Sequence, residues 1–166
     1  MIRLTELGLA QLKVSAVVRA ADEHLEPVGP ASEALDREGG EPLRLLRRVQ
    51  APLNVGSAVI TGAGDLAAEF VLHIVIQGQE RAASRETVRR ALTSAWHRAE
   101  GWQLTEVAAP LSGLGGATLT PEEAAVALVE TFRDRPRATG FPAELHIVVA
   151  SAAERGAVEP YLNTES

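Results

Sequence analysis

The chain has 166 residues, which is the length of one domain, and we expect residues 1–166 to form a single domain. Its composition, 46% hydrophobic and 23% charged, is typical of a globular protein, and the absence of cysteine excludes disulfides, thiolate nucleophiles and thiolate metal sites. A net charge of −6 and 4% aromatic residues argue against bulk nucleic acid as a partner, and without a recognisable signal peptide or membrane span we expect a cytoplasmic protein.

Five short segments with aliphatic and β-branched residues predict buried strands. In chain order they are 14–18, 56–61, 70–77, 106–109 and 144–150. Their apolar runs are nearly continuous rather than alternating, which indicates strands covered on both faces by helices.

Helices are predicted around these strands from their caps and their apolar periodicity. They cover 31–38, 41–49, 84–100, 121–133 and a C-terminal segment from residue 151. Thr120 to Glu123 and Ser151 to Glu154 each have the sequence of a capping box. The alternation of strands and helices predicts an α/β protein, a three-layer α/β/α sandwich with a mixed, mostly parallel sheet.

The loop Ala109–Pro121 is the best candidate for a ligand site. It leaves a predicted strand, contains three glycines and enters a capped helix. Ligands of open α/β sheets bind at the carboxyl ends of the strands, where such a loop can offer successive backbone N–H groups to an anion. The alternative is a plain connection with tight turns.

Four stretches of the chain match the motifs of one family in order. Residues 16–22 read A-V-V-R-A-A-D, against A-[IV]-V-N-A-A-N, and residues 34–40 match the helix after a glycine-rich loop. Residues 55–73 match V-G-x-A-V-I-T…G-x-L-P…Y-V-I-H, and residues 110–125 match a loop of the form P-x-x-G-x-G-x-G-G followed by an E-E-A-A helix. Together, over about Val14 to Val149, they resemble the macro domain, the ADP-ribose-binding module.

The resemblance implies binding of ADP-ribose and, in some members, hydrolysis of ADP-ribosyl esters or O-acetyl-ADP-ribose. It also implies an aspartate after the first strand for adenine, an asparagine at the distal ribose, and two loops whose N–H groups hold the phosphates. This chain departs from that pattern. Gly8 stands at the aspartate position, and Arg19 and Asp22 replace the motif asparagines.

The first phosphate loop has also changed, to Val28–Glu33. Pro30 has no N–H to offer a phosphate. A carboxylate at Asp22 or Glu33 would cost about 2 kcal/mol at ~7 Å from a phosphate charge, in an effective dielectric of ~20. We therefore predict weak binding of ADP-ribose or a related nucleotide metabolite, without hydrolysis and without a cofactor.

The resemblance assigns the ligand-binding residues by their motif positions. Backbone groups of the glycine loop would hold the phosphates, Leu9 would lie against the base, and Asp22 would face the distal ribose. The loop residues are Gly113, Leu114, Gly115 and Gly116. Two alternatives stay open: a structural or oligomerisation domain that has lost its ligand, and an ADP-ribosyl hydrolase with a rebuilt first loop.

Other patterns predict less. His24 follows two acidic residues, but His73 and His146 lie within apolar strands and no histidine pair has i, i+4 spacing, so no metal site is predicted. Ser112 lacks the glycine two residues earlier that a nucleophile elbow requires, so no catalytic residue is assigned. Trp96 and Trp102 belong either to the core or to an apolar patch for self-association, which leaves a homo-oligomer open.

Overall fold

The computed structural model describes residues 1–162 and is built on one six-stranded sheet in the order β1-β6-β5-β2-β4-β3. The strands are β1 (Ile2–Thr5), β2 (Ala16–Asp22), β3 (Ala58–Gly62), β4 (Phe70–Gln77), β5 (Glu106–Pro110) and β6 (Glu144–Val148). Neighbouring strands are parallel except β3, which runs antiparallel to β4. The predicted mixed, mostly parallel sheet is confirmed.

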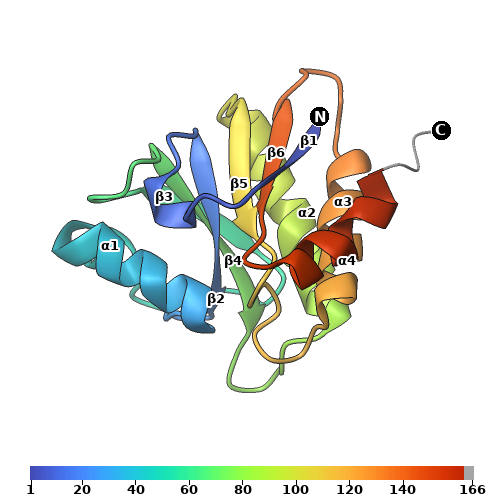
Figure 1. The fold of residues 1–166 in the computed structure, drawn as a ribbon. Helices are drawn as coiled ribbons and strands as arrows, with labels where there is room; N and C mark the ends of the chain where they lie inside the picture. The colour runs from blue at the N-terminus through green and yellow to red at the C-terminus, as the bar shows by residue number, and fades with distance from the viewer. Residues whose placement is uncertain (163–166) are drawn as a thin grey trace.

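Helices cover both faces of this sheet, as Figure 1 shows. The helices are α1 (Pro30–Leu46), α2 (Arg85–Gly101), α3 (Pro121–Arg133) and α4 (Ala152–Leu162), and a 3₁₀ turn, η1, spans Leu9–Gln11. Helix α1 and η1 lie on one face, and α2, α3 and α4 lie on the other. Alternate residues of each strand therefore face different helices, which explains the continuous apolar runs in β2 and β4.

The face under α2 and α3 carries the main apolar core. Trp96 and Phe132 are both 1% exposed, and their rings meet edge to face with centroids 5.4 Å apart. Of the two tryptophans, Trp96 therefore belongs to the core. Trp102, in contrast, is 55% exposed and contacts the ring of Phe70.

Of the two predicted capping boxes, the one at Ser151 to Glu154 forms in part: the Ser151 hydroxyl accepts from the N–H of Glu154, but the Glu154 carboxylate accepts from the N–H of Ala150. The box at the start of α3 forms completely. Thr120 accepts a hydrogen bond from the N–H of Glu123, and the Glu123 carboxylate accepts one from the N–H of Thr120, each at 3.1 Å. Helix α1 joins the two helices predicted at 31–38 and 41–49. It is kinked at Gly40, where φ is +66° and a side chain would lie 2.8 Å from the carboxylate of Asp65.

Strand β1 is an element that the apolar pattern did not predict. It has only four residues, its charged Arg3 is exposed, and it pairs with β6 at the edge of the sheet. Edge strands bury one face only, so their apolar signal is weak. Within residues 1–162, none of the helices has the length and the apolar character to cross a membrane.

Candidate functional site

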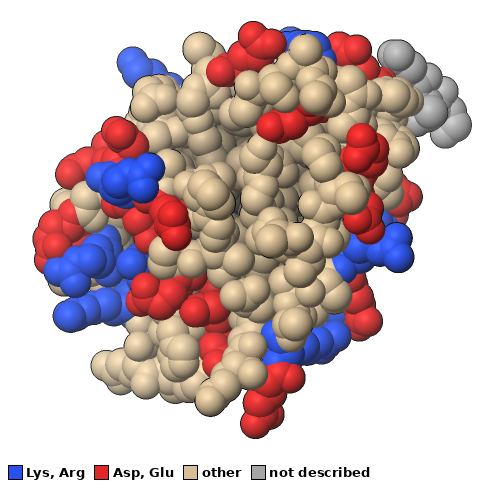
Figure 2. Space-filling model, turned by 60° about the horizontal axis from the view of Figure 1, so that its bottom comes forward, with Lys and Arg blue, Asp and Glu red and all other residues tan. Residues whose placement is uncertain are grey.

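The candidate site lies at the carboxyl ends of the parallel strands. Four segments meet there: the chain after β1, the loop between β2 and α1, the glycine loop 111–120 between β5 and α3, and the start of α4. Figure 2 shows this side of the molecule, whose middle is formed by uncharged residues with charged side chains around it. Two neighbouring cavities open in this region.

The larger cavity, of about 290 Å³, lies between η1, α1 and the start of α4. Its wall is mostly apolar and includes Leu9, Ala34, Leu35, Pro110 and Val148. Gly8 also lines it, and a side chain at that position would lie 2.0 Å from Oε1 of Gln11. The macro-domain pattern has an aspartate at the position of Gly8. In this chain the Gln11 amide fills the space that a side chain at Gly8 would occupy.

The smaller cavity, of about 180 Å³, is lined by the glycine loop and the start of α3. Inside this loop the N–H of Gly116 donates to the carbonyl of Gly113, at 3.0 Å, so it is already used. Among the described residues, none accepts a hydrogen bond from the N–H of Gly113, Leu114 or Gly115. Three of the four predicted loop donors therefore have no acceptor within residues 1–162.

The glycine loop is held in place by its own packing. The Leu114 side chain is 1% exposed and is part of the main core. Gly113 and Gly116 have φ of +74° and +67°, a conformation that favours glycine. A side chain at Gly115 would lie 2.5 Å from Cγ of Leu119, so this position also needs glycine.

Glu154 joins the two cavities. With Ser112 it lines both of them, and the Ser112 hydroxyl donates to its carboxylate at 2.5 Å. The same carboxylate accepts a hydrogen bond from the N–H of Ala150, at 3.3 Å. An anionic ligand that spans both cavities would pass this negative charge. The sequence indicated only a role in a helix cap for Glu154. Its position shortly after the last predicted strand, where ligands of such sheets bind, could have identified it as a site residue.

Asp22 lies apart from both cavities' walls. Its Oδ1 accepts hydrogen bonds from the N–H of His24, at 2.8 Å, and of Glu26, at 3.0 Å. The carboxylate therefore closes the turn after β2, as an Asx-type turn does. The following loop passes close to the glycine loop, because a side chain at Gly29 would lie 3.7 Å from the carbonyl of Gly113. The predicted partners Leu9 and Gly113 to Gly115 thus line the cavities, and Asp22 does not.

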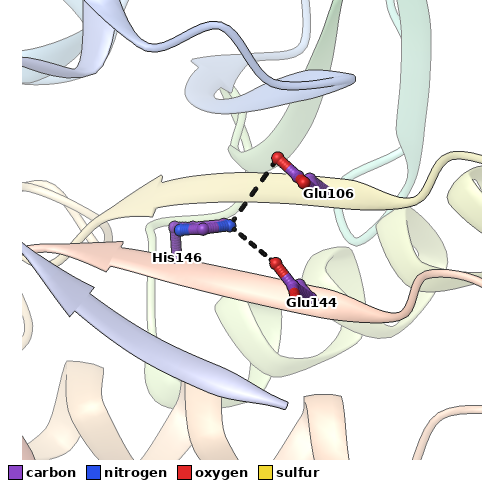
Figure 3. Close-up of side chains that lie close together, drawn as sticks. All are labelled: Glu106, Glu144 and His146. Carbon is purple, nitrogen blue, oxygen red and sulfur yellow. Dashed lines mark ion pairs between the residues drawn. The ribbon is translucent and has the colours of Figure 1, made fainter.

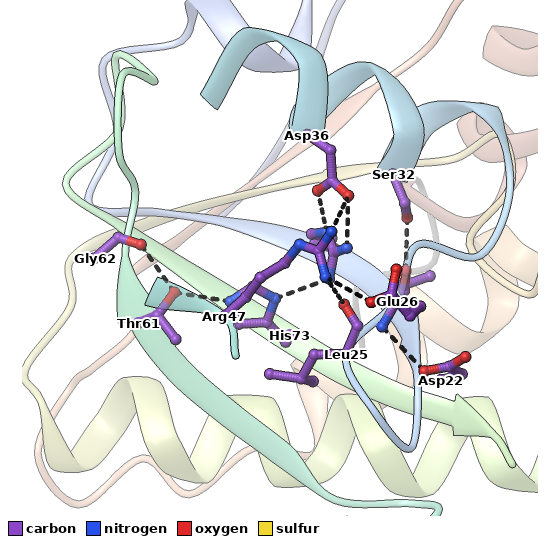
Figure 4. A network of polar contacts seen from close by, with 11 residues as sticks. Asp22, Leu25, Glu26, Ser32, Asp36, Arg47, Thr61, Gly62 and His73 are labelled. Carbon is purple, nitrogen blue, oxygen red and sulfur yellow. Dashed lines mark hydrogen bonds and ion pairs between the residues drawn. The ribbon is translucent and has the colours of Figure 1, made fainter. Parts of the chain in front are cut away.

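Arg19 faces α1 rather than the cavities. Its side chain is fully buried and makes two hydrogen bonds to the carboxylate of Asp36, at 2.7 and 2.9 Å (Figure 4). A second arginine, Arg47, lies 3.4 Å from the same carboxylate. Burial lowers the pKa of Arg19, and the hydrogen bond and charge of Asp36 oppose that shift. Arg19 and Asp22, the two residues at the motif asparagine positions, therefore both make contacts within the protein: Arg19 with Asp36, and Asp22 with the turn after β2.

His73 extends this network into the sheet. Arg19 Nη1 lies 3.2 Å from His73 Nδ1, and because arginine only donates, Nδ1 must be the acceptor. The proton is then on Nε2, which donates to the Thr61 hydroxyl at 2.8 Å (Figure 4). Burial first, and then the charges of Arg19 and Arg47, lower the pKa of His73 well below its usual value of 6.5. This histidine is a neutral core residue.

The sequence matches the family model of the Macro domain over residues 18–128. The chain belongs to the Macro domain family. The match spans most of β2, then α1, β3, β4, α2, β5 and most of α3, and so includes the glycine loop that lines the smaller cavity.

Similar proteins include macro domains with known names and structures. An O-acetyl-ADP-ribose deacetylase of Salmonella gallinarum is 31% identical, over 89% of this chain and 86% of that protein. An uncharacterised protein of Mycobacterium tuberculosis is 28% identical over 93% of this chain, which spans only 43% of that longer protein. The Trypanosoma brucei macrodomain in complex with ADP-ribose has the same fold, with a TM-score of 0.83 and 19% identity over 98% of this chain and 69% of that one.

Proposed function

We propose that this macro domain binds ADP-ribose or a related adenine nucleotide weakly and does not hydrolyse it. The observation that carries the proposal is an apolar cavity placed directly beside a glycine loop with three unused backbone N–H groups. An apolar wall suits a base, and successive N–H groups suit a phosphate. Solved macro domains with ADP-ribose or ADP bound support this ligand class.

The base would lie in the larger cavity against Leu9, with the Gln11 amide within reach of its polar edge. A glutamine amide offers one acceptor and two donors, which is the pattern that pairs with adenine. Gln11 would thereby supply the recognition that Gly8 cannot. The cavity's 290 Å³ lies near the lower limit of about 300 Å³ for ligand pockets, which suits a nucleoside rather than a complete dinucleotide-sized ligand.

Weak binding follows from the charge of Glu154 between the two cavities. A carboxylate about 7 Å from a phosphate costs ~2 kcal/mol at an effective dielectric of ~20. Absence of hydrolysis is proposed because Arg19 and Asp22 stand at the motif asparagine positions and are engaged elsewhere, with Asp36 and with the turn after β2. The proposal therefore separates binding from catalysis.

The direct test is a titration with ADP-ribose, ADP and AMP, followed by calorimetry and by thermal unfolding. We expect saturable binding, with a rise in melting temperature of roughly 5–11 °C at 100 times Kd. Gly115→Val should abolish binding, because its side chain would displace Leu119 and the loop. Gly101→Val is the matched control, since nothing lies within 4 Å of that position.

A second pair of variants tests the role of Glu154. Glu154→Gln keeps the shape and removes the charge, and we expect binding about 30-fold tighter, which corresponds to ~2 kcal/mol. Glu159→Gln, on the same helix and 54% exposed, should leave affinity unchanged. Equal effects of the two variants would contradict the charge argument. Incubation with O-acetyl-ADP-ribose should give no turnover, and turnover that needs Asp22 would favour the hydrolase instead.

The second candidate function is a structural domain that has lost its ligand. The exposed side chains of Trp102, Leu45 and Leu46 favour it, because each is at least half exposed and large apolar surfaces serve association. No thermal shift with millimolar ADP-ribose, ADP or AMP, together with a dimer in sedimentation analysis, would support this candidate.

A further inference from the structure

A second cluster of chemically active side chains lies at the other end of the sheet. Glu106 begins β5, Glu144 begins β6, and His146 follows two residues later (Figure 3). The register places Glu106 opposite Glu144. Leu145 and Ile147 point into the main core, so Glu144 and His146 project from the opposite face of the sheet. This cluster lies apart from the glycine loop, which follows the carboxyl end of β5.

We propose that Glu106, Glu144 and His146 bind a divalent transition metal ion of the Zn²⁺ type. One ligand atom from each residue lies within 4.8 Å of the others. His146 Nε2 is 3.2 Å from Glu144 Oε2 and 3.9 Å from Glu106 Oε2. Ligand atoms about 2.1 Å from one ion lie roughly 3–3.4 Å apart, so small rotations of the glutamate side chains bring all three into range.

Two features of the cluster favour a cation. Glu106 and Glu144 are directly opposite one another on neighbouring strands, an arrangement in which like charges destabilise a sheet. In addition, His146 Nε2 is shielded from solvent and makes no hydrogen bond in the structure, although it lies at ion-pair distance from Glu144. A metal ion between these groups would neutralise both carboxylates and occupy the free nitrogen.

The ligand chemistry selects the class of ion. An imidazole favours Zn²⁺ and its neighbours in the first row, and carboxylates are accepted by the same ions. Three protein ligands leave at least one position open for water. Arg3 lies 3.7 Å from Oε1 of Glu144, the oxygen away from His146, so it orients the carboxylate without occupying the ligand atom.

The simplest competing explanation is a protonated His146 that forms ion pairs with both glutamates. The two explanations differ in what Glu106→Gln does without metal, because His146 is the ion-pair partner of Glu106 whereas Glu144 also lies 3.7 Å from Arg3. An ion pair predicts a lower melting temperature for this variant, because the imidazolium loses a partner. A metal site predicts an equal or higher one, because the repulsion between two carboxylates is relieved.

The test uses the untagged chain after treatment with EDTA, titrated with ZnCl₂ and separately with MgCl₂. We expect Zn²⁺ to raise the melting temperature by roughly 5–11 °C at 100 times Kd, and Mg²⁺ to have a much smaller effect. Co²⁺ should give a visible absorption band upon binding. His146→Gln and Glu144→Gln should lose both signals, and Glu106→Gln serves as a third variant should either fold poorly.

His24→Gln is the matched control, because the exposed His24 lies 3.9 Å from Glu23 and, among residues 1–162, this pair has no third metal ligand beside it. It should keep the full response to Zn²⁺ and Co²⁺. The proposal is overturned if millimolar Zn²⁺ gives no shift, if the shift persists in His146→Gln, or if it disappears in His24→Gln. A lower metal-free melting temperature of Glu106→Gln would likewise overturn it in favour of the ion pair.

Discussion

The two faces of the sheet are built differently. Under α2 and α3 the buried side chains are almost all apolar, and they include Trp96, Phe132 and Leu128. Under α1 the sheet instead carries Arg19 and His73, both fully buried, and farther along it the half-buried His146. The first face gains most of its stability from apolar burial, whereas the second combines a smaller apolar cluster with buried charged and polar groups that need partners.

The difference shows where this domain can carry function. On an apolar face, replacing an apolar side chain with a polar one is costly, because each buried polar group needs a hydrogen-bond partner. The α1 face already contains such partners, and both candidate sites lie beside it: the larger cavity is lined by α1, and the glutamate–histidine cluster projects from the same face. The following predictions test whether the two faces respond differently to substitution.

The largest effect is expected at the buried ion pair. Asp36→Asn leaves Arg19 charged and without a carboxylate in a site with no solvent exposure. We expect a loss of about 3–5 kcal/mol in the free energy of unfolding, measured with urea. The double variant Arg19→Met, Asp36→Leu removes both charges and should regain part of that loss, because it also removes the donor of His73 Nδ1 and a partner of Arg47. A double variant as unstable as Asp36→Asn would contradict the assignment of the loss to an unpaired charge.

A smaller effect is expected from the polar contact within the apolar face. The Thr131 hydroxyl accepts a hydrogen bond from the indole N–H of Trp96, at 2.9 Å. Thr131→Val keeps the volume but leaves that N–H unpaired, so unfolding should become easier by about 1–3 kcal/mol. Thr93→Val, at an exposed position of α2, should stay within about 0.5 kcal/mol of the original chain.

The α1 face should also make stability depend on pH. His73 has a lowered pKa in the folded state, so below pH ~6.5 the unfolded chain binds a proton that the folded chain does not. Its contribution is complete above pH ~6.5 and is lost as the pH falls toward the folded-state pKa, with a slope of up to ~1.4 kcal/mol per pH unit. Urea unfolding of His73→Gln, measured over roughly pH 5 to 8 on either side of the ordinary histidine pKa, should show a smaller dependence of stability on pH than the original chain.

The smallest expected effect is at the cap of α3, which lies at the end of the helix and away from the packing of either face. Thr120→Ala removes the side-chain acceptor of the Glu123 N–H at the start of α3. A cap of this kind contributes about 1 kcal/mol, which thermal unfolding can measure. Because this cap follows the glycine loop, an accompanying loss of ADP-ribose affinity would indicate that the loop depends on α3 for its conformation.

The sequence by itself determined the order of elements and the class of the fold. Apolar runs, capping boxes and glycines are local signals, so strands β2 to β6, the capped starts of α2 and α3 and the glycine loop could be predicted without a structure. Strand β1 could not, because a short edge strand with an exposed arginine has a weak apolar signal.

Only the tertiary structure decided which polar groups meet. Arg19 stands at the position of a motif asparagine, but its pairing with Asp36 depends on α1 crossing β2. Glu154 reaches the cavities because α4 starts beside Ser112, and Glu106 reaches His146 because β5 and β6 are neighbours in the sheet. The physical reason is the same in each case: side-chain chemistry acts over a few ångströms, and residues distant in sequence come that close only through the packing of strands and helices.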